Sequence, residues 1–531
     1  MNKLPENPHV SAGINNPALM EAALALHDNR LHDAEPILKA HLKRDPFDVA
    51  AIRMLAELAG RIGRYNDAEN LLLRAVELAP SFIAARSNLA MLLHRQGRSA
   101  AALKELDHIA AIDSADAVNP NLKAAALGRI GEYDEAIAIY QQVLQSPDAH
   151  PKVWMSYGHV LKTVGRAADS VSAYRKALER APGLGEVWWS LANLKTVRFD
   201  DADIAAMEAA LAGNDVSEQD AFHLHFALGK AYEERKLADQ AFGHYEKGNA
   251  LRRQSLPYDS GDTHQQVKRA KQLYTPAFLE SRQGQGNPAP DPIFILGMPR
   301  AGSTLIEQIL SSHSMVEGTM ELPDIPALAA GARSGPGGIE GLSADELHAM
   351  GQTYLDRTRI QRKSGKPFYI DKLPNNWVHA GFIQLILPNA KIIDARRHPL
   401  DCGFSNFKQH FARGQAFSYD LGDMGRYYAD YVDLMTHFDE VLPGHIHRVI
   451  HEQMLEDTEI EIRALLDYLG LPFEESCLRF YDNDRAVQTA SSEQVRRPIN
   501  RDGVDQWRPF EVHLGPLKAA LGSLWETYPA V

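Results

Sequence analysis

The chain has 531 residues, which is long enough for two or more domains that each bury a core. Its composition, 45% hydrophobic and 24% charged, is globular and excludes a chain that is disordered throughout. The formal net charge of −13 argues against a protein that coats nucleic acid, so we expect clustered basic residues to serve local ligands.

The cysteine count and the lengths of the apolar runs bear on where in the cell the protein is expected. The two cysteines, Cys402 and Cys477, cannot form a disulfide framework and favour a reducing environment. Residues 1–8 lack the apolar centre of a signal peptide, and no apolar run is long enough to span a bilayer. The sequence therefore predicts a cytoplasmic protein without a membrane span.

The N-terminal half repeats with a period of 34 residues. The period is marked by glycines and small alanines in fixed register: Gly63, Gly97, Gly131 and Gly165, and Ala34, Ala68, Ala102 and Ala136. A glycine permits the turn between two helices, and the alanines let the helices approach closely; this pattern resembles the tetratricopeptide repeat. We expect an all-α superhelix over residues 14–255, of about six units, some of them degenerate, with residues 187–213 the most degenerate.

Superhelices of this kind present a concave surface that binds extended peptides or other proteins. The repeat array is therefore predicted to bind a protein partner or to deliver an acceptor. The alternative is a dimerisation or stability module, which leaves a homodimer open.

A connecting segment separates the repeat region from a second region with a different pattern of apolar residues. Residues 256–290 read as a connecting helix followed by a Gly/Pro-rich linker. From residue 291 to 531 short apolar runs alternate with helical stretches, which predicts an α/β domain with a mostly parallel sheet. Strands are expected near residues 293–296, 368–371, 391–395 and 446–450.

The first of these strands leads into a loop of the type that binds a phosphate group. Residues 293–296 are apolar, and Gly302, Ser303 and Thr304 follow at the start of a helix, where free backbone N–H groups attract an anion. Arg300 adds a fixed charge. The spacing from Gly297 nearly matches a P-loop, but Ser303 occupies the position where a nucleotide triphosphatase has lysine. That substitution argues against ordinary hydrolysis of nucleoside triphosphates.

A second basic strand end lies about a hundred residues later. The strand at 391–395 leads to Arg397, and Ser405 follows eight residues further on. In this order and spacing the two segments resemble the sulfotransferase family, whose donor is 3'-phosphoadenosine 5'-phosphosulfate (PAPS). The resemblance implies a fold of the P-loop α/β group.

The resemblance assigns donor-binding roles to both segments. It implies that the loop holds the 5'-phosphosulfate through Arg300, Ala301, Gly302, Ser303 and Thr304. It implies that Arg397 and Ser405 bind the 3'-phosphate, the group that separates PAPS from ATP.

The similarity is closest to the tyrosylprotein-sulfotransferase branch, and it implies the catalytic residues. Glu321, twenty-one residues after Arg300, stands where that branch has its base, and Lys372 stands where it stabilises the donor's bridging oxygen. Sulfuryl transfer needs in-line positioning and charge neutralisation, which Arg300 and Lys372 supply without a metal. A phenol acceptor with a pKa near ~10 benefits from a carboxylate that removes its proton.

Residues 491–499 resemble the family segment that closes over the donor. Ser491, with Ser492 beside it, and Arg497 are the positions it assigns to donor binding. Two positions depart from the pattern of the animal enzymes. His451 stands where a tyrosine is usual, and Gln506 stands where a basic residue precedes the tryptophan; Arg496 or Arg508 is the candidate for the missing charge.

Three further features carry weaker hypotheses. Residues 331–341, with five glycines, are a candidate lid over the acceptor, or else an exposed loop. His445, His447 and His451 lie close together in sequence but lack a second ligand cluster, so we expect no metal. His410 follows the second phosphate element closely and is a further candidate for the active site.

The leading function is a PAPS-dependent sulfotransferase that modifies a hydroxyl acceptor, with peptide or protein tyrosine as the first candidate acceptor. A small-molecule, sugar or lipid hydroxyl is the first alternative. A phosphotransferase with a related loop, or a non-catalytic repeat scaffold that keeps the nucleotide pocket, is the other.

Overall fold

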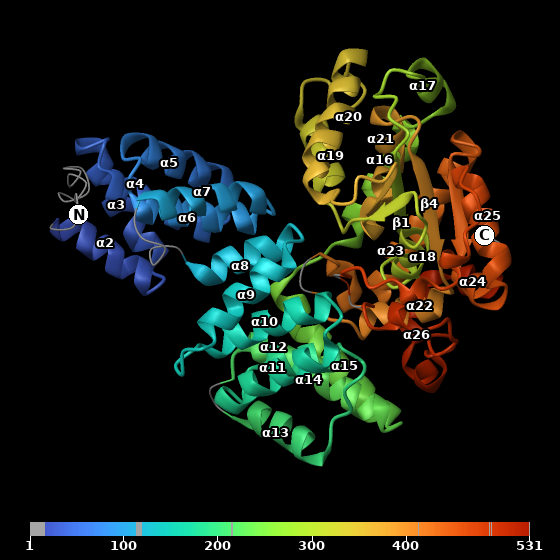
Figure 1. Ribbon diagram of the computed structural model, residues 1–531, viewed down its shortest axis with the longest axis horizontal. Helices are drawn as coiled ribbons and strands as arrows, with labels where there is room; N and C mark the ends of the chain where they lie inside the picture. The colour runs from blue at the N-terminus through green and yellow to red at the C-terminus, as the bar shows by residue number, and fades with distance from the viewer. Residues whose placement is uncertain are drawn as a thin grey trace. The chain divides into compact units, whose positions relative to one another are not determined.

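The computed structural model describes residues 16–112, 119–213, 216–411, 414–487, 489 and 491–529 (Figure 1). The chain forms two compact units, Met1–Val160 and Leu161–Val531. Helix α10 (Pro151–Thr163) crosses the boundary between them. The division falls inside the repeat array predicted over residues 14–255, whose boundaries stay a prediction.

The first unit is a series of helical hairpins. Its helices are α2 (Pro17–His27), α3 (Leu31–Arg44), α4 (Val49–Arg61), α5 (Tyr65–Leu78), α6 (Ile83–Arg95), α7 (Ser99–Ile112), α8 (Pro120–Arg129) and α9 (Tyr133–Val143). Consecutive helices pack as pairs: α2 with α3, α4 with α5, α6 with α7 and α8 with α9.

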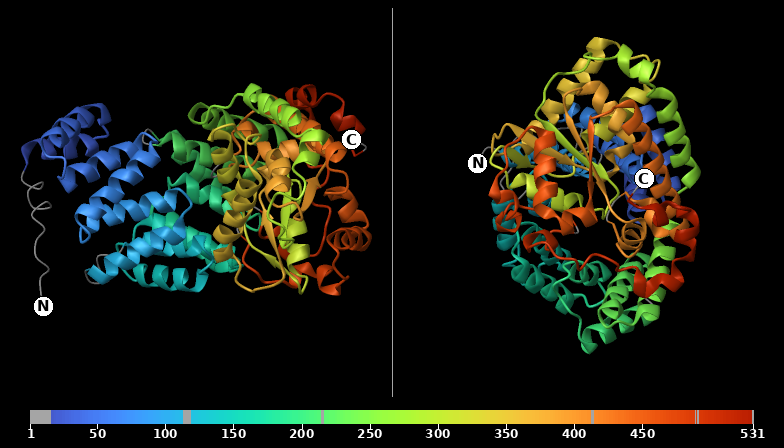
Figure 2. Two further views of the ribbon diagram at one scale, coloured as in Figure 1. Left: turned by 90° about the horizontal axis from the view of Figure 1, so that it is seen from above. Right: turned by 90° about the vertical axis from the view of Figure 1, so that its right-hand side faces the viewer.

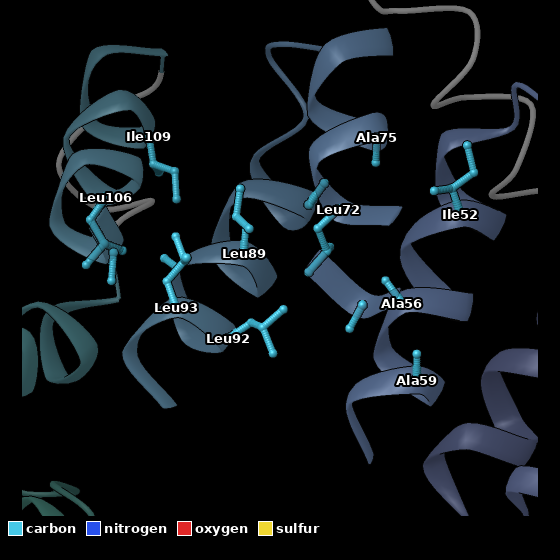
Figure 3. Packing of buried hydrophobic residues seen from close by; sticks show 14 residues of the cluster. Ile52, Ala56, Ala59, Leu72, Ala75, Leu89, Leu92, Leu93, Leu106 and Ile109 are labelled. Atoms are coloured by element: carbon cyan, nitrogen blue, oxygen red, sulfur yellow. The ribbon is translucent and has the colours of Figure 1, made fainter. Parts of the chain in front are cut away.

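The repeat glycines and alanines explain this packing. Gly63, Gly97, Gly131 and Gly165 have φ values of 81°, 81°, 87° and 80°, a conformation that a side chain disfavours. Ala68, Ala102 and Ala136 are at most 1% exposed, so the paired helices touch where the alanines lie. Around them Leu72, Leu89 and Leu106 fill a continuous core through α4 to α7 (Figure 3).

The second unit begins with more helical hairpins of the same kind. Its first helices are α11 (Ala167–Arg180), α12 (Gly185–Ala192), α13 (Asp201–Ala212), α14 (Glu218–Glu234), α15 (Ala238–Ser255), α16 (Ser260–Leu273) and α17 (Pro276–Ser281). Helix α12 has only eight residues and lies in the segment predicted to be the most degenerate.

A five-stranded parallel sheet forms the centre of this unit, with helices packed around it (Figure 2). The strand order is β2 (Val316–Gly318), β3 (Phe368–Lys372), β1 (Pro292–Gly297), β4 (Lys391–Arg396) and β5 (Ile446–Ile450). Every paired strand runs parallel to its neighbour. The four predicted strands are present, and β2, at three residues, is too short for its pattern to be recognised.

Helices connect these strands and follow them. They are α18 (Ser303–Ser311), α19 (Asp324–Ser334), α20 (Ala344–Thr358), α21 (Ala380–Ile386), α22 (Pro399–Phe407), α23 (Leu421–Val441), α24 (His451–Glu456), α25 (Thr458–Leu469), α26 (Gly515–Leu521) and α27 (Leu524–Thr527). Short 3₁₀ turns, among them η3 (Pro374–His379), η7 (Gln494–Arg496) and η8 (Arg508–His513), complete the unit.

The repeat-type helices of this unit pack directly on its α/β part. Asn249 of α15 is buried, and its Nδ2 donates to the carbonyl oxygen of Phe407 at 2.9 Å. The ring of Phe242 stacks on that of Phe407, with 5.7 Å between centroids. A buried amide bonded to backbone costs free energy to expose, so this contact fixes α15 against the end of α22.

The predicted architecture of an all-α repeat region followed by an α/β domain with a parallel sheet is confirmed. In the described part of the chain, no helix combines the length and the apolar character needed to cross a bilayer.

Candidate active site

The loop between β1 and α18 has a backbone that the sequence dictates. A Cβ on Gly297 would lie 2.4 Å from the carbonyl oxygen of Ala395 on β4, so the strand pair needs glycine there. Gly302 has a φ of 97°, and a Cβ there would lie 2.6 Å from Nδ1 of His451. Helix α18 begins at Ser303, where the first backbone N–H groups have no partner within the helix. The loop therefore has the geometry of a helix start whose N–H groups could hold an anion.

The two predicted phosphate elements touch each other. Nε of Arg300 donates to Oγ of Ser405 at 3.1 Å, and Nη1 of Arg397 donates to the carbonyl oxygen of Arg300 at 2.9 Å. Arg300 Nη1 also donates to Oγ of Ser491 at 2.5 Å. Burial, and then the charge of Arg397, lower the pKa of the Arg300 guanidinium to about 10. Two cations held this close favour an anionic ligand.

Arg397 retains an unused donor. Its side chain is buried, and its Nη2 donates to the carbonyl oxygen of Gly503. Nε of Arg397 has no hydrogen-bond partner among the described residues. Because a buried donor without a partner is costly, this atom fits a ligand oxygen.

The predicted base and its lysine also lie together. Lys372 is the last residue of β3, and its Nζ donates to Oε1 of Glu321 at 2.5 Å. The side chain of Lys372 is 2% exposed and that of Glu321 is 47% exposed. The buried lysine therefore fixes the carboxylate of Glu321, whose side chain is partly exposed to solvent.

These side chains line one cavity of about 250 Å³. Of the predicted site residues, it is lined by Arg300, Gly302, Ser303, Thr304, Glu321, Lys372, Arg397, Ser405, His451, Ser491 and Arg497. Ala301 is buried in the loop and does not line the cavity. Of the two neighbouring serines, Ser491 faces the cavity and Ser492 does not.

His451 begins α24 directly after β5 and lies against Gly302. Burial, followed by the charges of Arg397 and Arg300, lowers its pKa to about 3. The imidazole is therefore neutral at physiological pH and can share a hydrogen bond with a ligand without adding charge. In the described part of the chain His445 and His447 do not join it in a group of potential metal ligands; His41, Asp45 and Asp48 form such a group instead.

Two weaker sequence hypotheses are corrected by the structure. Residues 331–334 belong to α19 and no residue of 331–341 lines the cavity, so this segment is not its lid. His410 points away into an aromatic cluster, with its ring 4.6 Å from that of His223 and 4.9 Å from that of Phe222. Its position after α22, which packs on the repeat-type helices, explains the difference.

The cation that lies beside Gln506 is a lysine that the sequence analysis did not single out. Neither Arg496 nor Arg508 lines the cavity: Arg496 donates to the carbonyl oxygens of Thr163 and Arg485, and Arg508 pairs with Asp505. Instead Nζ of Lys408 donates to Oε1 of Gln506 at 2.8 Å. Lys408 directly follows α22 and lies three residues after Ser405, and that spacing is the signal that could have identified it.

Sequence reasoning also missed the wall formed by the repeat-type helices. The missed lining residues are Trp189, Ala192, Asn193, Lys195, Lys230, Glu233 and Tyr245. No local motif marks them, because they reach the cavity through the packing of α12, α14 and α15 within the second unit.

The cavity is strongly basic although the protein is acidic overall. Seven cationic side chains line it against two carboxylates, Glu233 and Glu321. The cations are Lys195, Lys230, Arg300, Lys372, Arg397, Lys408 and Arg497. A ligand with several negative charges fits this lining.

Comparison with known proteins agrees with this geometry. A profile of the sulfotransferase family matches residues 292–475, and a profile of the tetratricopeptide repeat matches residues 53–117 and 121–185. The chain thus carries a sulfotransferase-family domain together with tetratricopeptide repeats.

Three proteins have sequences that are similar to parts of this chain. An uncharacterized protein of Aquifex aeolicus (strain VF5) is 33% identical over 399 residues, covering 72% of this chain and 52% of that protein. The chain thus spans about half the length of that relative. Protein-tyrosine sulfotransferase 1 of Danio rerio is 25% identical over 271 residues (43% and 71%), and protein-tyrosine sulfotransferase A of Caenorhabditis elegans is 22% identical over 233 residues (40% and 60%).

Two solved structures are similar to parts of this chain. The sulfotransferase domain from the curacin biosynthetic pathway is 19% identical, covers 42% of this chain and 92% of that chain, and gives a TM-score of 0.32. MamA is 24% identical, covers 30% and 92%, and gives a TM-score of 0.26.

Proposed function

We propose that the protein transfers a sulfuryl group from PAPS to a hydroxyl acceptor. The observation that carries the proposal is the direct contact between the two phosphate elements, through Arg300 with Ser405 and Arg397 with the carbonyl oxygen of Arg300. A donor with phosphate groups on both sides of its ribose needs two such elements in one cavity. The match of residues 292–475 to the sulfotransferase family supports the same reaction class.

The lining residues suit that donor. Gly302, Ser303 and Thr304 present the helix start to the 5'-phosphosulfate, with Arg300 beside them. Arg397 and Ser405 would hold the 3'-phosphate, and Nε of Arg397, which has no partner in the described part of the chain, offers it a donor. His451, Ser491 and Arg497 complete the set from the closing side of the cavity. The bound donor supplies the activated sulfuryl group.

The catalytic roles follow from the contact between Glu321 and Lys372. Glu321 is exposed enough to accept the proton of an acceptor hydroxyl, and Lys372 orients its carboxylate through the 2.5 Å contact. Arg300 and Lys372 supply fixed positive charge, which stabilises negative charge developing on oxygen. No metal is required by this arrangement.

The acceptor is proposed to be a tyrosine of a peptide or protein. Two relatives are named protein-tyrosine sulfotransferases, and the chain carries repeats of a kind that binds proteins. The cytoplasmic location stays a prediction from composition.

Calorimetry with 3',5'-adenosine diphosphate, the desulfated product, tests the donor assignment. The wild-type chain should bind it more tightly than AMP, and Arg397→Ala should lose on the order of 10- to 100-fold in that preference, since hydrogen bonds to charged groups contribute about 1.5–3 kcal/mol. Arg508→Ala, which removes an exposed guanidinium outside the cavity, is the matched control and should bind as wild type does.

Because Arg397 is buried, its variant needs a check on folding by thermal melting. Ser405→Ala, a smaller change at the same subsite, should reduce the preference in the same direction. Equal affinity of the wild-type chain for the two nucleotides would contradict the donor assignment.

A further inference from the structure

Residues 491–499 form part of the cavity wall, and we call them the wall segment. Most of them line the cavity, among them Ser491 and Arg497, and Oγ of Ser491 accepts from Nη1 of Arg300 at 2.5 Å. The place of this segment therefore decides where these two side chains lie. Arg496, which precedes Arg497, does not line the cavity.

Arg496 contacts a turn of the repeat region instead. Its Nη2 donates to the carbonyl oxygen of Arg485 at 3.1 Å and to that of Thr163, the last residue of α10, at 3.4 Å. The backbone N–H of Val487 donates to the same carbonyl oxygen of Thr163 at 3.0 Å. All of these residues belong to the second unit. Arg496 thus links the wall segment to the end of α10.

The glycine of that turn makes room for the arginine. A Cβ on Gly165 would lie 2.8 Å from Cζ of Arg496, so the guanidinium occupies the space that a side chain there would take. Gly63, in the same register of an earlier repeat, has a φ of 81° against 80° at Gly165, yet a Cβ there would meet nothing within 4 Å. Both turns need glycine for their backbone, but at Gly165 the missing side chain also admits Arg496.

A second turn of the repeat-type helices contacts the wall segment. Lys195 follows α12, and its Nζ donates to Oε1 of Gln494 at 3.0 Å. Gln494 and Arg496 are the first and last residues of η7. The turns after α10 and α12 therefore both hold this short helix of the wall segment.

We propose that Arg496 is a positioning residue, which ties the wall segment to the turn at Thr163 and Gly165 and so keeps Ser491 and Arg497 facing the donor. The proposal rests on the proposed function. A ligand that meets side chains already held in place loses less free energy in ordering them. Donor affinity then depends on an arginine that lies outside the cavity.

Calorimetry on the full chain with 3',5'-adenosine diphosphate tests the proposal. Arg496→Ala should weaken binding by about 10-fold, because the ligand then has to order the wall segment itself. Arg496→Lys, which keeps a charged donor on a long side chain, should restore part of the affinity. Arg501→Ala is the matched control and should bind as the wild-type chain does, since Arg501 pairs with Glu456 at the surface and does not line the cavity.

Gly165→Ala breaks the same contact from the repeat side. Its methyl group should displace the guanidinium and lower the affinity about as far as Arg496→Ala does. Gly63→Ala introduces the same backbone strain without the collision, so it should lower the unfolding temperature but leave the affinity unchanged. The double variant of Arg496→Ala and Gly165→Ala should bind no more weakly than Arg496→Ala alone, because both changes remove one contact.

These measurements separate positioning from a purely structural role, which predicts a lower unfolding temperature without loss of affinity. Wild-type affinity in Arg496→Ala, or equal losses of affinity in Gly165→Ala and Gly63→Ala, would refute the role of Arg496 while the donor assignment stands. If the wild-type chain does not prefer the diphosphate over AMP, the donor assignment fails and this proposal fails with it.

Discussion

At the scale of single residues, the pair of Lys372 and Glu321 shows how the fold prepares a carboxylate. Lys372 is almost fully buried at the end of β3, so its ammonium needs a partner, and Glu321 supplies it at 2.5 Å. The same contact fixes Oε1 of Glu321, while 47% of the side chain stays exposed. Position and charge balance thus come from one interaction.

Glu321→Gln should abolish turnover and leave the affinity for 3',5'-adenosine diphosphate near the wild-type value. The amide keeps the shape of the side chain but cannot take a proton, and loss of general base catalysis lowers rates by roughly 10²- to 10⁴-fold. Turnover measured with radiolabelled donor, alongside calorimetry, separates chemistry from binding. Glu340→Gln, an exposed glutamate outside the cavity, is the control, and turnover that survives in Glu321→Gln would place the base elsewhere.

Single residues could be predicted from the sequence where a local motif fixes them. Arg300, Arg397 and Ser405 sit in strand ends whose pattern is visible within about ten residues, and the structure places all three on one cavity. Lys195 could not be predicted, because its contact with Gln494 spans 299 positions along the chain. The roles assigned to all of these residues stay predictions.

At the scale of elements, the turn from β1 into α18 depends on Gly302 for two separate reasons. The backbone there is left-handed, and the ring of His451 occupies the space where a Cβ would project. Sheet strands were predictable from their apolar runs, whereas the extension of α19 into a glycine-rich stretch was not, since helix ends depend on packing.

Gly302→Ala should destabilise the protein and weaken binding of 3',5'-adenosine diphosphate, since the added carbon would lie 2.6 Å from Nδ1 of His451. Backbone strain of this kind costs about 1–3 kcal/mol. Thermal unfolding and calorimetry measure the two effects.

Gly284→Ala separates strain from collision, because Gly284 has a φ of 75° with nothing within 4 Å of the added carbon. This control should lose stability but keep nucleotide affinity. Similar nucleotide affinity in the Gly302→Ala and Gly284→Ala variants would show that the contact with His451 does not shape the site.

At the scale of the whole molecule, the compact unit that holds the cavity begins at residue 161 and includes helices of the repeat type. The sequence predicted a repeat region and a separate α/β region, and both patterns are present. It could not predict that α15 packs against the end of α22, because the contact of Asn249 with Phe407 joins positions 158 residues apart. Periodicity reveals the repeats but carries no information on what their last members touch.

A fragment of residues 256–531 should therefore lose affinity for 3',5'-adenosine diphosphate and unfold at a lower temperature than the full chain. It lacks Lys195, Lys230 and Glu233, and it exposes the ring of Phe407 that Phe242 covers. A fragment beginning at residue 151, which keeps α10 whole, should retain nucleotide binding. Wild-type affinity in the shorter fragment would show that the helical wall is dispensable.

The placement of the cavity wall in α12, α14 and α15 also limits how this architecture can diverge. Among the described residues, the first that lines the cavity is Trp189, so gain or loss of whole 34-residue units ahead of α10 leaves every lining residue in place. Gain or loss of a repeat unit between α11 and α15 would remove or displace the basic residues that these helices contribute to the cavity wall. The number of early repeat units can therefore change without altering the cavity. The last units have to be kept, because their residues form part of it.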